Sequence, residues 1–145
     1  MIPKIIHYCW FGKSELPVLA KKCISSWKKY MPDCEIKEWN EENFDVNIIK
    51  YTKEAYNYKK YAFVSDFVRF YVLKKYGGIY LDVDVEIIKP LDDLLEYKTI
   101  LGFESVGRVN PGLILASEPD TLLFSPLIGL EKKCEYVSIN NRNRG

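Results

Sequence analysis

The feature of this sequence that most constrains its fold is the apolar segment of residues 61–76, which ends at the Gly77–Gly78 pair. The run predicts a helix, and the glycines predict its end. Because the segment is apolar on nearly every side, we expect a buried helix. Ser65, Asp66 and Arg69 interrupt it at spacings of one, three and four residues, which places them on one helix face. Buried charges need partners, so this face carries an ordinary ion pair or, as we favour, borders a polar cleft.

Two carboxylates follow the glycines almost at once. A short apolar strand over 79–81 leads into Asp82, Val83 and Asp84. In an extended stretch, residues two apart project on the same side, so both carboxylates can share one ligand. Such oxygen ligands suit Mg²⁺ or Mn²⁺, whose coordination is completed by water and substrate phosphates. Asp-x-Asp alone is a weak signal, but its expected place at the carboxyl edge of a sheet, where α/β proteins bind ligands, favours a site.

The rest of the chain predicts a single α/β domain over residues 1–145 with a mostly parallel sheet, because strands and helices alternate. We expect strands over 4–11, 34–39, 99–104 and 112–117, helices over 17–32, 51–58 and 118–130, further extended structure over 86–90, and a frayed tail over 138–145.

Composition excludes several classes of protein. With 48% apolar and 28% charged residues, the chain is neither disordered nor collagen-like. The net charge of +1 creates no field that would attract nucleic acid, so we expect no nucleic-acid partner and at most peripheral membrane association. The four cysteines lack metal-site spacing and are expected to be reduced. The first residues do not resemble a signal peptide, so we expect a cytoplasmic protein.

A family resemblance rests on several of these segments. The stretch over residues 58–95, YKKYAFVSDFVRFYVLKKYGGIYLDVDVEIIKPLDDLL, resembles the DxD sugar transferases, a family of yeast mannosyltransferases and bacterial capsule and lipopolysaccharide glycosyltransferases. The catalytic domains of large clostridial toxins are similar at a greater distance. The opening IPKIIHYCWFG over 2–12 and WNEENFD over 39–45 match the same family. The resemblance extends over about residues 2–117.

This resemblance implies a GT-A-like α/β fold, in a shortened version, with helices flanking the sheet. It also implies a nucleotide-diphosphate sugar donor, a Mn²⁺ or Mg²⁺ cofactor, and transfer of a hexose with retention of configuration. The acceptor would be a saccharide or a glycolipid. By analogy with the family, the pathway would be surface polysaccharide or lipopolysaccharide synthesis, at the inner face of the membrane.

The resemblance also assigns roles to individual residues. Asp84 matches the direct metal ligand, and Asp82 matches a residue that contacts the ribose, the sugar or a metal-bound water. Asp66 matches a residue that holds sugar hydroxyls, and Arg69 one that holds the diphosphate. Trp10 matches an aromatic residue that packs on the nucleotide base. Asn110 corresponds loosely to an asparagine that faces the sugar.

Several alternatives stay open at this point. Trp10 can equally be a core residue. We interpret His7 as a core or cleft-edge residue rather than a catalytic base. The sequence identifies no enzyme nucleophile. The chain can be a non-catalytic fragment that binds a nucleotide sugar or a carbohydrate, or a purely structural domain. A phosphatase of the haloacid dehalogenase type fits poorly, because Val85 and Glu86 follow the motif where Gly-Thr is required.

Overall fold

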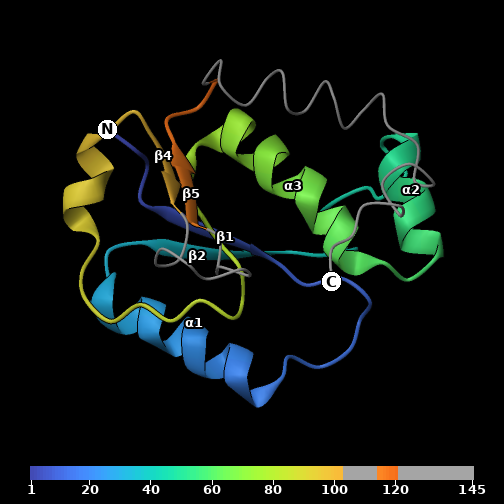
Figure 1. Cartoon of the computed structure of the whole chain (residues 1–145), viewed down its shortest axis with the longest axis horizontal. Helices are drawn as coiled ribbons and strands as arrows, with labels where there is room; N and C mark the ends of the chain where they lie inside the picture. Colours follow the sequence, from blue (N-terminus) through green and yellow to red (C-terminus); the bar gives the residue numbers. More distant parts are fainter. Residues whose placement is uncertain (103–113, 121–145) are drawn as a thin grey trace.

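The computed structural model describes residues 1–102 and 114–120, which form one five-stranded sheet (Figure 1). The strand order is β2-β1-β3-β5-β4. Strand β1 pairs in parallel with β2 and β3, whereas β5 is antiparallel to both β3 and β4. Four of the strands therefore run in one direction, which confirms the mostly parallel sheet. The strands are β1 (Ile5–Cys9), β2 (Glu35–Trp39), β3 (Gly78–Leu81), β4 (Thr99–Gly102) and β5 (Ile114–Ser117).

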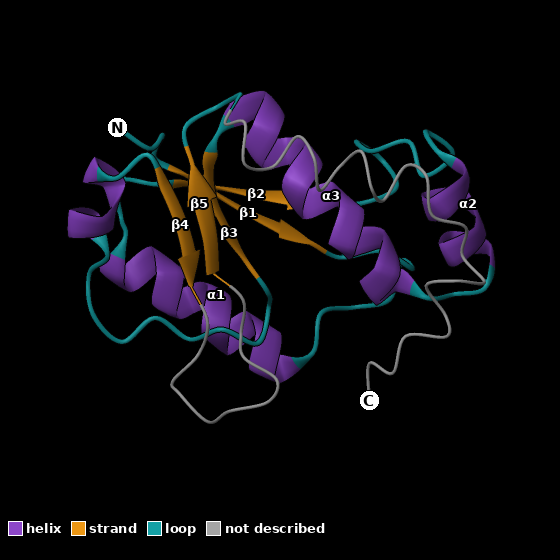
Figure 2. Cartoon of the chain, turned by 45° about the horizontal axis from the view of Figure 1, so that its top comes forward, coloured by secondary structure: helices purple, strands orange, loops and turns teal. Residues whose placement is uncertain are grey.

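Helices cover both faces of this sheet, as Figure 2 shows. One face packs against α1, and the other packs against α3, which in turn contacts α2. The helices are α1 (Val18–Tyr30), α2 (Lys50–Asn57) and α3 (Tyr61–Tyr76), with a short 3-10 helix, η1 (Asp92–Glu96). Of the helices described, none is both long and apolar enough to cross a bilayer.

Alternation along the central strand explains why both faces of the sheet are buried. In β3, Ile79 and Leu81 lie in the core on the α1 side, and Tyr80 between them lies in the core on the α3 side. Successive strand residues point to opposite faces, so a strand covered by helices on both sides is apolar throughout. Helix α3 has the predicted bounds, and it contributes Val64, Phe67, Val68, Val72 and Leu73 to the core.

The segment after β3 lies outside the sheet. Residues 86–90 were predicted to resume extended structure, and in the structure this segment pairs with no strand of the described sheet. It is held instead by α1, since the Trp27 indole N–H donates to the Val85 carbonyl at 2.7 Å. The Ile87 N–H donates to the Ser26 hydroxyl at 2.9 Å. These bonds satisfy backbone groups that would otherwise pair with a neighbouring strand. The β-branched residues of the segment were therefore not sufficient to make it a strand.

Some predictions fall outside the described residues. Asn110, Cys134 and the tail over 138–145 lie there, as does the predicted helix over 118–130 apart from its first three residues.

Candidate active site

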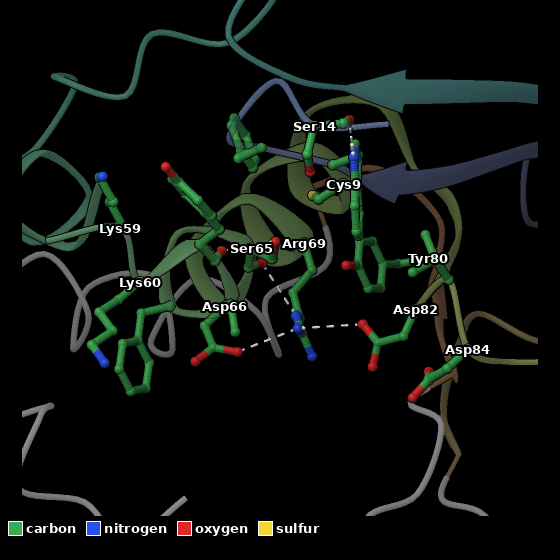
Figure 3. Close-up of a pocket in the computed structure, with 16 residues that line it drawn as sticks. Cys9, Ser14, Lys59, Lys60, Ser65, Asp66, Arg69, Tyr80, Asp82 and Asp84 are labelled. Carbon is green, nitrogen blue, oxygen red and sulfur yellow. Dashed lines mark hydrogen bonds and ion pairs between the residues drawn. The ribbon is translucent and has the colours of Figure 1, made fainter. Parts of the chain in front are cut away.

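A cleft of about 900 Å³ opens at the carboxyl ends of β1 and β3. These strands are parallel neighbours, so the loops that follow them leave the sheet at the same edge. The third wall is the first half of α3. Figure 3 shows the side chains that line the cleft. Those with polar groups or aromatic rings include Trp10, Phe11, Ser14, Lys59, Lys60, Tyr61, Phe63, Ser65, Asp66, Arg69, Tyr80, Asp82 and Asp84.

The Asp-x-Asp residues both line this cleft, but not for the reason that strand alternation predicts. Strand β3 ends at Leu81, and the chain turns at once, with the Val85 N–H donating to the Asp82 carbonyl at 3.1 Å. A turn therefore replaces the expected extended stretch. The Asp82 side chain is 30% exposed and Asp84 is exposed at the rim. Because the turn closes on itself, it brings both carboxylates to one wall of the cleft.

Arg69 lies at the centre of the polar group. Its Nη2 is 3.2 Å from Oδ1 of Asp66 and 3.5 Å from Oδ1 of Asp82. Its Nε donates to the Ser65 carbonyl at 3.2 Å. The guanidinium also lies over the Tyr80 ring, 4.9 Å from its centroid. The helix pair of Asp66 and Arg69 is thus present, but it extends across the cleft to the end of β3.

The electrostatic environment keeps Arg69 charged. Burial by itself would lower the pKa of Arg69, but the surrounding Tyr80, Asp82 and Asp66 raise it above its ordinary value. The Arg69 side chain is only 12% exposed. Charges that are little exposed attract more strongly than the same charges in water. This guanidinium is therefore a fixed positive charge directed at the cleft.

Trp10 lies between the core and the cleft. Its ring is half-buried, lines the cleft and packs against the core on the α1 side. The indole N–H donates to the Ser14 carbonyl at 2.8 Å, and the backbone N–H donates to the Trp39 carbonyl at 2.9 Å. These bonds fix the orientation of the ring while leaving part of its surface exposed to the cleft.

Sequence reasoning missed Glu41, which holds the loop that carries Trp10. Its Oε2 accepts hydrogen bonds from the Gly12 N–H at 2.5 Å and from the Tyr56 hydroxyl at 2.8 Å. Burial would raise the pKa of Glu41, but these bonds lower it below its ordinary value. Gly12 has φ +101°, and a Cβ there would lie 2.5 Å from the Tyr61 ring. In the sequence, Glu41 belongs to a polar connection that gives no sign of this contact.

His7 and Cys9 are reactive residue types in structural positions. The His7 ring is buried, and its Nδ1 accepts from the Trp39 indole at 3.0 Å, so Nε2 carries the proton donated to the Gly77 carbonyl at 2.8 Å. Burial lowers the pKa of His7. Cys9 lines the cleft, but burial raises the pKa of its thiol to about 12, so it is not a thiolate nucleophile at neutral pH.

The donor set of the cleft fits a divalent ion that binds together with a substrate. Among the residues that the structure describes, no group of three or more His, Cys, Asp or Glu side chains could hold a metal ion. Mg²⁺ sites, however, commonly use one or two carboxylates and leave the remaining positions to water and substrate phosphates. Asp82 and Asp84 are two such carboxylates in an open cleft.

The fold and cleft define an α/β protein that collects acidic and basic side chains at the carboxyl edge of its sheet. Residues 17–101 match the family described as the glycosyltransferase sugar-binding region containing a DXD motif, and the chain belongs to this family. The matched region includes Asp66, Arg69, Asp82 and Asp84. It begins at residue 17, so it leaves out the loop after β1 but includes the other two segments that line the cleft.

Curated relatives show the same relationship. Inositol phosphoceramide mannosyltransferase 3 of Schizosaccharomyces pombe is 36% identical over 107 residues, which cover 66% of this chain and 28% of that protein. Mannosyltransferase 2 of the same series is 30% identical over 145 residues, covering 93% and 40%. Glucan organizing enzyme 1 of Cryptococcus neoformans is 49% identical over 75 residues, covering 46% and 20%. The chain spans less than half the length of these relatives.

A solved structure described as PaToxG glycosyltransferase is similar in fold. The TM-score is 0.69 at 18% sequence identity, and the match covers 98% of this chain and 64% of that one. At this identity the comparison shows the fold alone. The fold is therefore that of a glycosyltransferase, in agreement with the expectation from the sequence.

Proposed function

We propose that this chain binds a nucleotide-diphosphate sugar with a divalent metal ion and transfers the hexose to a saccharide or lipid-linked acceptor. The observation that carries the proposal is the position of Arg69, which joins Asp66 on α3 to Asp82 after β3 in a cleft also lined by Asp84. In a chain of the DXD family, this cleft offers a positive charge for a diphosphate and carboxylates for a metal ion and for sugar hydroxyls.

The metal ion and Arg69 would act on the same part of the donor. Asp84, with Asp82, would hold Mn²⁺ or Mg²⁺ together with phosphate oxygens. When bound, the ion would oppose the negative charge that builds on the departing diphosphate. Arg69 adds a fixed positive charge on the opposite wall. A dication opposes the charge more strongly than one guanidinium, so we expect losses to be largest at Asp84, then at Asp82, with Arg69 and Asp66 close behind.

The remaining contacts would position the sugar and the base. Asp66 would accept hydrogen bonds from sugar hydroxyls, and Trp10 would offer its exposed ring surface to the base. During transfer, the bond from the anomeric carbon to the diphosphate oxygen breaks and a bond to the acceptor hydroxyl oxygen forms. The hydroxyl proton passes to the leaving diphosphate or to solvent. We propose retention of configuration, as the family resemblance implies.

The acceptor and pathway follow from the relatives by analogy. The names of the yeast relatives describe mannosyl transfer to inositol phosphoceramide, a lipid. For this chain we propose a saccharide or glycolipid acceptor in the synthesis of a surface glycolipid or polysaccharide.

Calorimetric titration tests the donor site. UDP-sugars and GDP-sugars are titrated into the wild-type chain with Mn²⁺ and with EDTA. We expect one nucleotide series to bind only with the metal, and Asp84→Asn to lower the donor affinity about 100-fold, because a carboxylate that would hold the ion is lost. Glu86→Gln is the matched control, since this exposed carboxylate lies two residues further and does not line the cleft. Equal donor affinity with and without metal would contradict the proposal.

A second candidate is a non-catalytic donor-binding unit. Metal-dependent donor binding without release of free nucleoside diphosphate, in the presence of acceptors or water, would distinguish this candidate from an active transferase.

A further inference from the structure

The cleft has opposite charges at its two ends. Figure 3 shows Asp82 and Asp84 at one end, Lys59 and Lys60 at the other, and Arg69 between them. The acidic end is the proposed metal and diphosphate site. The lysines lie on the same cleft, but none of the roles assigned above uses them.

The junction between α2 and α3 fixes both lysines at this position. Lys59 has φ +59°, which is uncommon for a residue other than glycine, and its N–H donates to the Tyr56 carbonyl at 2.9 Å. The Lys60 N–H donates to the Ala55 carbonyl at 2.8 Å, and Lys60 directly precedes α3. These hydrogen bonds hold the backbone of both lysines beside the cleft. Their long side chains are exposed.

Among the described residues, Lys21, Lys50 and Lys74 pair with carboxylates, whereas most other lysines, including Lys59 and Lys60, do not. Lys59 and Lys60 differ from the other described lysines in that they line the cleft. Lys21 pairs with Glu15 at 2.9 Å, and Lys74 pairs with Asp120 at 3.6 Å. Within the described part of the chain, neither Lys59 nor Lys60 has an ion-pair partner. The first turn of α3 contains no acidic residue, and a helix N-terminus adds positive potential. This end of the cleft therefore has a positive potential that would attract an anion.

The position of the lysines separates them from the diphosphate of the donor. Lys60 precedes Arg69 by nine residues, which corresponds to about 13 Å along the helix axis. Asp66 lies between them, where the transferred sugar is proposed to bind. A donor whose diphosphate lies between Asp84 and Arg69 therefore directs its sugar toward the lysines. The molecule next to that sugar is the acceptor.

We propose that Lys59 and Lys60 form a subsite for a phosphate group on the acceptor, so that the transferase prefers phosphorylated acceptors to neutral ones. This inference rests on the proposed function, because it takes the acidic end of the cleft as the donor site. Two ammonium groups offer several N–H donors to phosphate oxygens and pair with them as point charges. They act as specificity determinants rather than as catalytic residues.

The test compares acceptors that differ only in the phosphate. Transfer is measured to a methyl hexoside, to the same hexoside carrying a phosphate, and to a phosphate-linked glycolipid in phosphatidylcholine vesicles. We expect wild type to favour the phosphorylated hexoside in kcat/KM. In Lys59→Gln/Lys60→Gln the ratio of phosphorylated to neutral acceptor falls at least about tenfold, because charge-assisted hydrogen bonds are lost. The vesicle acceptor shows whether a lipid-linked phosphate is taken as well as a soluble one.

A second lysine pair provides the matched control. Lys28 and Lys29 are exposed on α1 and do not line the cleft, so Lys28→Gln/Lys29→Gln is expected to leave the ratio unchanged. An unchanged ratio in the Lys59 and Lys60 variant overturns the subsite. A loss of donor affinity without a change in ratio also overturns it, because the lysines would then serve the donor.

Donor calorimetry separates this failure from a failure of the proposed function. If wild type binds a donor with Mn²⁺ but the ratio does not respond to the lysines, only the subsite is wrong. If wild type binds no donor under any condition, the proposed function and the subsite are both wrong.

Discussion

At the scale of single residues, Arg69 shows how one side chain can organise a site. A guanidinium presents donors in a planar fork, so it can face two carboxylates and a backbone carbonyl together. Here it faces Asp66, Asp82 and the Ser65 carbonyl. In this arrangement Arg69 limits the repulsion between Asp66 and Asp82. It also places positive charge where a diphosphate would bind.

This arrangement predicts that Arg69→Lys is not a conservative change. Lysine keeps the charge but loses the planar fork and the contact with the Tyr80 ring. We expect kcat/KM for the sugar donor to fall about 100-fold, mainly through kcat, because the charge on the diphosphate is greatest in the transition state. Steady-state release of the nucleoside diphosphate measures the effect.

Lys74→Ala is the control for this substitution, since Lys74 lies at the other end of α3 and pairs with Asp120 outside the cleft. Its activity should equal that of wild type. An Arg69→Lys variant with a wild-type kcat would show that Arg69 only stabilises the fold.

At the scale of elements, the site depends on a loop held by a residue far from it in sequence. Glu41, after β2, binds the Gly12 N–H of the loop after β1 and the Tyr56 hydroxyl of α2. One carboxylate thus connects three segments, and the loop it holds carries Trp10. We infer that Glu41 is a positioning residue for the donor base.

Removing this carboxylate should affect binding more than chemistry. We expect Glu41→Ala to raise the KM for the donor about tenfold, with little change in kcat, because the Trp10 loop loses its orientation while the diphosphate site stays intact. Glu41→Gln should restore most of the affinity, since its carbonyl oxygen still accepts a hydrogen bond. Kinetics with varied donor concentration provide both constants.

The neighbouring Glu42 is exposed and provides the matched control, because Glu42→Ala removes the same number of atoms from the same loop. If Glu41→Ala lowers kcat and leaves KM unchanged, Glu41 acts on the reaction rather than on the Trp10 loop.

At the scale of the whole molecule, His7 joins elements that are distant in sequence. It lies in β1, accepts from Trp39 of β2, and donates to Gly77 between α3 and β3. The neutral ring donates through Nε2 and accepts through Nδ1. Protonation of Nδ1 would remove the acceptor and break the hydrogen bond from Trp39. Folding therefore requires His7 to be neutral.

This requirement predicts that stability depends on pH. The pKa of His7 is lowered in the folded chain from 6.5, so the unfolded chain binds a proton first as the pH falls. Below pH of about 6.5 the free energy of unfolding should fall by up to about 1.4 kcal/mol per pH unit, until the folded pKa is reached. Urea unfolding at about pH 7.5, 6.5 and 5.5 measures how the free energy of unfolding changes with pH.

In His7→Gln the slope over this range should disappear, although the variant is less stable overall. The Glu41 carboxyl has a lowered pKa, so its contribution is lost only at pH below about 4.5 and does not enter the range. A slope that persists in His7→Gln would assign the pH dependence to another group.

The sequence by itself determined the local features of this protein. Periodicity and the glycine pair predicted α3 over residues 61–76, its polar face, and a short strand that ends just before Asp82. These features depend on residues close together in the chain, where helix geometry and side-chain volume decide the outcome.

Only the tertiary structure decided which residues meet. The turn at Asp82, the tie between α1 and the segment after β3, the contact of Glu41 with Gly12, and the place of Lys59 and Lys60 on the cleft all depend on packing between distant segments. The hydrogen bonds and charges that fix them have no period in the sequence. Their partners are selected by which backbone groups remain unsatisfied once the sheet and helices have packed.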